Sequence, residues 1–580
     1  MNPVNQAQMA EFAESFSLLS QSQSDQFELY SIYSILNGGS GENVDPFQAH
    51  LKGAEFGLDG VAVIVQGQLV TNADEASTAI GDSRNPLVDF YFFQGKTSAK
   101  FDYGDIGKFF DAVSEFFSDE MRGESAQLDD LISAKDYIYR HAVNRRNPGI
   151  HLFFATTGNF EANARIERLI ENTFNGLSEQ NIFDGDRIKI DLVGAGQLQR
   201  LYRAAVTASE VKIEFDKNIV LPKHPSVDEG FLGYLSAKEL MKIISIFDEN
   251  GEISSINRSV FFDNIRDYNP NSKINKEISE SLKANEHENF IYRNNGITVV
   301  AKSVSRIGDT FTIEDFQVVN GCQTSNVIFA NRESLDGVQI PFRLIGTKDE
   351  DFIFSIISGT NKQNPVRDEQ FWSLLPFMKN LEEYSRKADE HHHIFLERRE
   401  NQYRSESIEK ARIVQMQPFF KAVTAALLGL PHRAARNYRN EIKDREDTIF
   451  SENEDIRPYH AAAFIHYRLE FLWRNQKIKS ETKIYRFYIM DAVVRKILGK
   501  QRFEDLSGRN KVKFAEKIVE LASDEEKMAK MVKSVEKVLD AKLAEFKVGD
   551  DARERLRDTI RSESFFLSVR PDYTPKTGQL

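Results

Sequence analysis

The sequence predicts a multidomain α/β protein with an N-terminal α/β domain, a central α+β domain and a C-terminal helical region. The chain has 580 residues, more than a single hydrophobic core normally organises. Apolar runs of strand length alternate with helical patterns in the first part, strands and polar turns mix in the middle, and helical spacing dominates the rest. We therefore expect domains at residues 1–208, 209–350 and 351–580.

The first domain is predicted from the alternation of apolar patterns. Asp25–Leu36 carries a rough helical stripe that Gly38 and Gly39 end. Strands are expected at Val61–Val65 and at Val88–Phe93 because both runs are short and apolar. The elements expected after them are helices over 104–119 and 128–141, a strand at 150–155, a helix near 162–175, a strand at 188–193 and a helix near 197–205.

Polar residues flank two of these strands. Asp59 stands just before the run Val61–Val65, and Gln94 and Lys96 end the run that begins at Val88. Gln94 and Lys96 are two residues apart, so they face the same side of a strand. Phosphodiester hydrolysis needs a divalent ion on hard oxygen ligands and a cation that holds water or phosphate. Asp59 and Lys96 supply both kinds of group.

This arrangement resembles the PD-(D/E)xK nuclease superfamily, and specifically its Mrr-like branch, in which glutamine replaces the acidic residue before the lysine. The resemblance implies a restriction-endonuclease-like fold with catalytic residues Asp59, Gln94, Lys96 and Glu28. Mg²⁺ or Mn²⁺ would be held by Asp59, Gln94 and Glu28, the last on the helix ahead of the Asp strand. Gln94 is a neutral ligand, so metal affinity would depend on the carboxylates and the Gly95 carbonyl. The alternative is that Asp59 is a turn residue and Lys96 an ordinary strand end.

Two motifs in the middle of the chain, Arg293–Val300 and Phe316–Ser325, resemble the signature of the AIPR family, the abortive-infection phage-resistance proteins. The resemblance covers about residues 225–430 and implies a role in bacterial antiviral defence, often with an N-terminal nuclease-like domain. It does not assign the chemistry of that domain. Further segments follow in the order expected of the family: Gly230–Leu240, Phe262–Tyr268, Asn275–Ile278 and Thr360–Val366.

The same two motifs have a physical interpretation. Asn294–Gly296 precedes a strand and Asn320–Gly321 follows one, so hairpin-like turns are expected at Asn295 and Asn320. Turns rich in amides can contact phosphates or bases. Alternatively, Asn and Gly only supply positive φ angles there.

Arginines beside tyrosines form two further clusters, which contain Arg398, Arg399, Arg433, Arg436 and Arg439. Such clusters can hold backbone phosphate and stack on bases, although interleaved acidic residues favour a salt-bridged helix surface equally well. The run of histidines at 391–393 is interpreted as a solvated loop or helix end rather than a metal site.

Composition limits the possible functions. The net charge of −13 gives no global basic footprint, so any nucleic-acid contact must be local. A single cysteine, Cys322, excludes an intramolecular disulfide and fits a reducing cytoplasm. The first thirty residues lack the apolar core of a signal peptide, and no later run has the ~18 apolar residues of a membrane span. We expect a cytoplasmic protein that does not enter a membrane.

The sequence thus predicts an antiphage defence nuclease that cleaves DNA with Mg²⁺. One alternative is an RNA-cleaving nuclease, and another is a non-catalytic nucleic-acid or partner-binding sensor with a degenerate nuclease fold. A phage trigger or a neighbouring defence protein is an expected partner, and a homo-oligomer is possible on this sequence.

Overall fold

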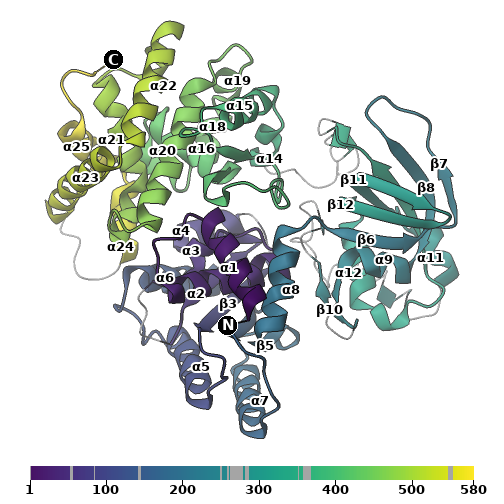
Figure 1. Ribbon diagram of the computed structural model, residues 1–580. Helices are drawn as coiled ribbons and strands as arrows, with labels where there is room; N and C mark the ends of the chain where they lie inside the picture. The colour runs from purple at the N-terminus through teal and green to yellow at the C-terminus, as the bar shows by residue number, and fades with distance from the viewer. Residues whose placement is uncertain are drawn as a thin grey trace.

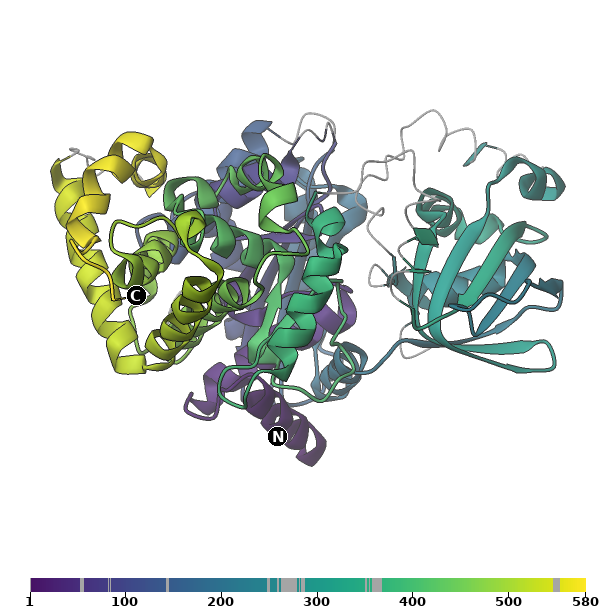
Figure 2. The same cartoon turned by 90° about the horizontal axis from the view of Figure 1, so that it is seen from above.

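The computed structural model describes residues 2–52, 57–81, 83, 85–141, 146–247, 251–257, 260–261, 279–280, 282, 287–349, 352–353, 355–356, 368–545 and 553–579. Figure 1 shows three parts: an N-terminal domain and a C-terminal helical region packed against each other, and a central β-rich domain to one side. The view from above in Figure 2 shows the same separation of the central domain. None of the described helices combines the length and apolar character needed to cross a membrane.

The N-terminal domain is built on a five-stranded mixed sheet in the order β2-β1-β3-β4-β5. The strand β1 runs antiparallel to β2 and β3, whereas β3, β4 and β5 are parallel. Gly60 pairs with Phe93, which brings the start of β1 to the end of β3. The strands are β1 (Gly60–Val65), β2 (Gln68–Val70), β3 (Val88–Lys96), β4 (Gly149–Thr156) and β5 (Ile188–Val193).

Alternate side chains of these strands bury two apolar layers, one on each face of the sheet. Phe90 and Phe92 point into one layer, with α5, α6 and α4, and Tyr91 and Phe93 point into the other, with α1, α2 and α8. The expected alternation of helices and strands is confirmed. The helices are α1 (Pro3–Ser15), α2 (Gln23–Tyr33), α3 (Pro46–Ala49), α4 (Ala73–Ile80), α5 (Tyr103–Phe117), α6 (Ala126–His141), α7 (Ala164–Glu179) and α8 (Ala195–Val206), and α2 continues into a π-helical turn at Ser34–Gly39.

The central domain contains a six-stranded sheet in the order β6-β12-β11-β13-β8-β7. All neighbouring strands are antiparallel except β11 and β13, which are parallel. Its strands are β6 (Glu210–Glu214), β7 (Asn218–Val220), β8 (Glu229–Ser236), β11 (Ile297–Ile307), β12 (Thr310–Asn320) and β13 (Gln339–Gly346), and β9 (Ser245–Phe247) pairs separately with β10 (Ile253–Ile256). The α-helices described in this domain are α9 (Ala237–Ile244), α11 (His287–Arg293) and α12 (Cys322–Ala330).

The hairpin turns expected at Asn295 and Asn320 are wrong. The chain reverses between β11 and β12 at Gly308, where φ is +65°. Thr298 pairs with Asn320, so the two asparagine motifs lie together at the opposite end of the hairpin. Nothing in the sequence around Val300 indicates that β11 continues as far as Ile307.

The C-terminal region is mainly helical over residues 368–545 and 553–579. A parallel pair of short strands, β14 (Phe395–Glu397) and β15 (Ile413–Gln415), interrupts it. One large apolar cluster joins its helices. They are α14 (Asp368–Ser373), α15 (Pro376–Lys387), α16 (Met416–Ala426), α17 (Pro431–Ala434), α18 (Tyr438–Lys443), α19 (Glu446–Ile449), α20 (Arg457–Arg474), α21 (Arg486–Leu498), α22 (Gly508–Ser523), α23 (Glu525–Glu545), α24 (Arg553–Arg561) and α25 (Glu563–Tyr573).

Charged side chains join the helical region to the N-terminal domain. Asp45 pairs with Arg474, and Arg557 Nη2 lies 2.6 Å from Asp130 Oδ2. Asp74 is buried between Arg436 and Arg561. Three more of the arginines proposed for nucleic acid also contact carboxylates: Arg398 pairs with Glu382, Arg433 with Glu441 and Arg439 with Glu369. These pairs favour the salt-bridged alternative for both arginine clusters.

Candidate functional site

Asp59 is fixed where β1 begins beside the end of β3. Its backbone N–H donates to the Phe93 carbonyl at 2.9 Å, and its own carbonyl accepts from the Leu51 N–H at 2.8 Å. The side chain is 9% exposed. Its Oδ2 accepts two hydrogen bonds of 2.7 Å, one from Gln94 Nε2 and one from the Gly95 N–H. The structure therefore brings the predicted residues Asp59 and Gln94 into direct contact.

Gln94 contacts Asp59 through its amide nitrogen, because a carboxylate oxygen can only accept. The amide oxygen Oε1 is buried and has no hydrogen-bond partner within the described part of the chain. An unpartnered buried oxygen is costly, and it is a hard ligand of the type that Mg²⁺ prefers. Lys96 lies two residues further along β3 and is partly exposed.

Glu28 approaches the same strand end from α2. A methyl group at Gly95 would lie 3.5 Å from the Cα and Cγ atoms of Glu28, so strand and helix are nearly in contact there. Glu28 Oε2 bonds to His50 Nε2 at 2.8 Å, and Oε1 accepts from Ser24 Oγ at 3.0 Å. His50 follows the short helix α3, and its backbone bridges to Gly60 at the start of β1.

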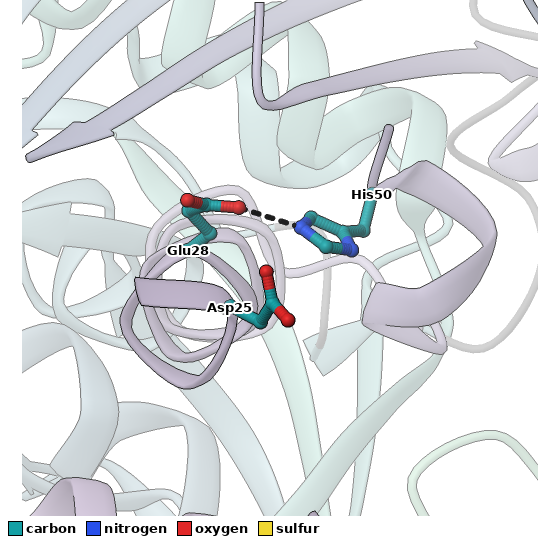
Figure 3. Close-up of side chains that lie close together, drawn as sticks. All are labelled: Asp25, Glu28 and His50. Atoms are coloured by element: carbon teal, nitrogen blue, oxygen red, sulfur yellow. Dashed lines mark hydrogen bonds and ion pairs between the residues drawn. The ribbon is translucent and has the colours of Figure 1, made fainter. Parts of the chain in front are cut away.

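Asp25 completes a group of possible metal ligands with Glu28 and His50 (Figure 3). One ligand atom from each of the three residues lies within 4.8 Å of the others. No other such group of His, Cys, Asp and Glu occurs among the residues that the structure describes, and His391, His392 and His393 are not part of one. Sequence reasoning identified Glu28 but missed Asp25 and His50. Asp25 could have been found from its position three residues before Glu28 on a helix, whereas nothing in the sequence pattern marks His50.

The electrostatics of the two carboxylates differ. Burial raises the pKa of Asp59 to about 7, and the charge of Glu28 adds to this effect; the Gly95 N–H, Lys96 and Gln94 oppose it. Burial also acts to raise the pKa of Glu28, but the hydrogen bonds and charge contributed by His50 and Ser24 outweigh it and lower that pKa. A buried carboxyl group whose ionisation a neighbouring carboxylate disfavours is a suitable environment for a divalent cation.

We expect Mg²⁺ to stabilise the folded protein more at about pH 8 than at about pH 5. The raised pKa of Asp59 means that this carboxyl holds its proton in the folded state until about pH 7, so protons compete with the metal below that value. At a hundredfold excess over Kd the gain is about 2.7 kcal/mol. Thermal unfolding with and without MgCl₂ across this pH range measures it. An equal gain in wild type and in Glu28→Gln would show that the ion binds elsewhere.

The two asparagine motifs of the central domain also meet, but in a structural role. Asn294 Nδ2 donates to Thr324 Oγ1 at 3.0 Å, and Asn294 Oδ1 accepts from the Gly296 N–H at 2.8 Å. Gly296 and Gly321 have φ angles of +83° and +94°, which favours the simpler interpretation of these turns. The segments Phe262–Tyr268, Asn275–Ile278 and Thr360–Val366 lie outside the described residues.

Comparison with known families gives one result. Residues 261–546 match the family model described as AIPR protein, a region that runs from the central domain to just past the end of α23. It leaves Glu28, Asp59, Gln94 and Lys96 outside the match. No curated protein and no solved structure matches the chain. The resemblance expected from Arg293–Val300 and Phe316–Ser325 agrees with this match, since both motifs lie within residues 261–546, the region that is similar to AIPR proteins.

Proposed function

We propose that this chain is an abortive-infection protein of antiphage defence whose N-terminal domain is a metal-dependent nuclease that cleaves DNA. The AIPR match suggests the defence role. The nuclease proposal depends on one observation: Asp59 and Gln94 are in contact at adjacent strand ends, with Lys96 on the same strand and Glu28 on the helix beside them. This arrangement resembles the PD-(D/E)xK site in its residue types and in their positions on the strands and the helix.

The residues present fit a divalent ion. Asp59 and the unpartnered Gln94 Oε1 would hold Mg²⁺ or Mn²⁺ at the strand ends, and Glu28 would contribute from α2. Asp59 is not part of the group formed by Asp25, Glu28 and His50, whose ligand atoms lie within 4.8 Å of one another. When bound, such an ion neutralises charge on the scissile phosphate and lowers the pKa of a water molecule. Lys96 contributes a cation that orients the attacking water or the phosphate. His50 keeps Glu28 ionised through their hydrogen bond.

The test compares Lys96→Ala with wild type on labelled double-stranded DNA, single-stranded DNA and RNA, each with Mg²⁺ or Mn²⁺. We expect wild type to cleave DNA and Lys96→Ala to lose roughly 100- to 1,000-fold in rate. The matched control is Lys100→Ala, since Lys100 is exposed and four residues beyond the site. Equal rates for wild type and Lys96→Ala would remove Lys96 from the chemistry.

A second candidate function is a nucleic-acid-binding sensor without turnover. The neutral Gln94 favours it, because an acidic residue at that position would bind a metal ion more tightly. This alternative predicts that folded wild-type protein retains DNA without cleaving it, and that Lys96→Ala still protects cells from phage. Cleavage confined to the RNA arm would instead identify an RNA nuclease.

A further inference from the structure

Two cavities lie between the N-terminal domain and the helical region, and Phe261 and Gln317 of the central domain also line the larger one. A cavity of about 220 Å³ and one of about 160 Å³ adjoin, since the same five residues line both. We call these five residues the junction: Gln48, Glu75, Lys421, Arg486 and Phe487. Gln48 and Glu75 come from the N-terminal domain, and the other three come from α16 and α21.

The junction has more positive than negative charge. Lys421 is 7% exposed, and its Nζ lies 4.0 Å from Glu75 Oε1, which is a weak ion pair. Glu75 already accepts two hydrogen bonds of 2.9 Å from Thr71 through its other oxygen. Arg486 Nη2 lies 3.1 Å from Glu470 Oε1, but Arg486 Nε is buried without a hydrogen-bond partner among the described residues. Lys483 adds a further cation to the wall of the 160 Å³ cavity.

Most of the other carboxylates around the two cavities have partners of their own, so they do not cancel this surplus. These pairs are Asp45 with Arg474, Asp74 with Arg436 and Arg561, Asp130 with Arg557, and Glu369 with Arg439. Burial raises the pKa of Glu397 to about 7, which reduces its negative charge near neutral pH. A buried guanidinium N–H and a buried ammonium that lack close partners are suited to a phosphate group.

The cavities are also lined by an aromatic ring and by glutamine side-chain amides. Phe487 borders both cavities, and the side chains of Gln48, Gln68, Gln317 and Gln417 line the larger one. An aromatic ring stacks on a nucleobase, and amides donate to and accept from its edge. We propose that these cavities form a nucleotide site, with phosphate held by Lys421 and Arg486 and the base placed against Phe487.

The junction is linked to the cluster around Glu28. Gln48 lies on α3, and His50 follows this helix directly. Gln127, which lines the 160 Å³ cavity, donates a hydrogen bond from Nε2 to the His50 carbonyl at 2.9 Å. His50 in turn bonds to Glu28. A bound nucleotide that shifts α3 would therefore move His50 and Glu28. This regulatory link rests on the proposed nuclease function, whereas the binding itself does not.

Binding is tested on the full chain by calorimetry and thermal unfolding with ATP, adenosine and inorganic pyrophosphate as probes, in EDTA so that the ligands around Glu28 hold no metal. ATP is expected to raise Tm, pyrophosphate to do so less, and adenosine to have little effect. Arg486→Gln should weaken ATP binding about tenfold, the loss of one charge-assisted hydrogen bond. Lys496→Gln is the matched control, because Lys496 lies exposed on the same helix α21.

Two further variants keep the result interpretable. Phe487→Leu retains the cavity charges and should weaken ATP binding while leaving pyrophosphate binding unchanged. Asp59→Asn should bind ATP as wild type does, so a failed nuclease proposal leaves this one standing. The proposal is overturned if ATP has no effect on folded wild-type protein or if Arg486→Gln binds it equally well. Equal effects of pyrophosphate and ATP would reduce the site to one for a simple anion.

Discussion

Asp59→Asn is expected to abolish metal-dependent cleavage and, without divalent ions at about pH 8, to raise the thermal stability of the protein. Cleavage should fall on the order of 10³-fold because the metal loses a charged ligand. Stability should rise because asparagine keeps the shape and can still accept from Gln94 and the Gly95 N–H, but it is neutral in a buried position. The unfavourable charge beside Glu28 disappears.

The stability difference between Asp59→Asn and wild type should depend on pH, and the raised pKa of Asp59 determines its sign. The pKa of Asp59 is raised from 3.8 to about 7, so the wild-type protein loses stability as the pH rises through this range, whereas Asp59→Asn does not. The Tm difference should therefore open between about pH 4 and pH 7 and stay constant above. Each kcal/mol corresponds to about 2–4 °C for a domain of this size. Asp111→Asn on the exposed side of α5 is the control, and retained cleavage by a folded Asp59→Asn would reject the site.

Gly321→Ala is expected to destabilise the central domain by on the order of 3 kcal/mol or more. Gly321 has a φ of +94°, and a methyl group there would lie 2.6 Å from Ile297 Cγ1 and 2.8 Å from the Gly296 carbonyl oxygen. The second contact is with backbone, which cannot rotate away. Denaturant unfolding followed by a probe in the central domain measures the loss.

Gly308→Ala separates the steric part of that loss from the backbone part. Gly308 also has a positive φ, +65°, but a methyl group at this position meets no atom within 4 Å. Its cost should be about 1 kcal/mol, the value for conformational strain alone. Similar losses for the two variants would mean that the two motifs do not pack as tightly as the structure has them.

The strands and helices of the N-terminal domain were predictable because their apolar residues follow clear periods. Phe90 and Phe92 alternate with Tyr91 and Phe93 and bury opposite faces of one sheet, as the pattern indicates. In the central domain the hairpin turn was misplaced, because Asn–Gly pairs are strong turn signals wherever a positive φ is needed. At Asn320 the positive φ of Gly321 precedes a helix rather than reversing a hairpin.

The candidate site was predictable only in part. Asp59, Gln94 and Lys96 belong to strand ends that periodicity identifies, and Glu28 lies on a helix with an apolar stripe. His50 comes from the chain after a four-residue helix, and only the pairing of its backbone with Gly60 brings it to Glu28. The junction residues come from segments more than 300 positions apart, and no local pattern relates Gln48 to Lys421 or Arg486.

The ion pairs of Asp74 can form only late in the synthesis of the polypeptide. This carboxylate is 2% exposed, and its partners Arg436 and Arg561 are made long after it. At about 5–20 residues per second, a ribosome needs roughly 25 to 100 s to pass from Asp74 to Arg561. Throughout that interval the side chain of Asp74 in the nascent N-terminal domain lacks these two partners and is solvated by water. The domain that carries Asp59 therefore reaches its final packing only when nearly the whole polypeptide has been synthesised.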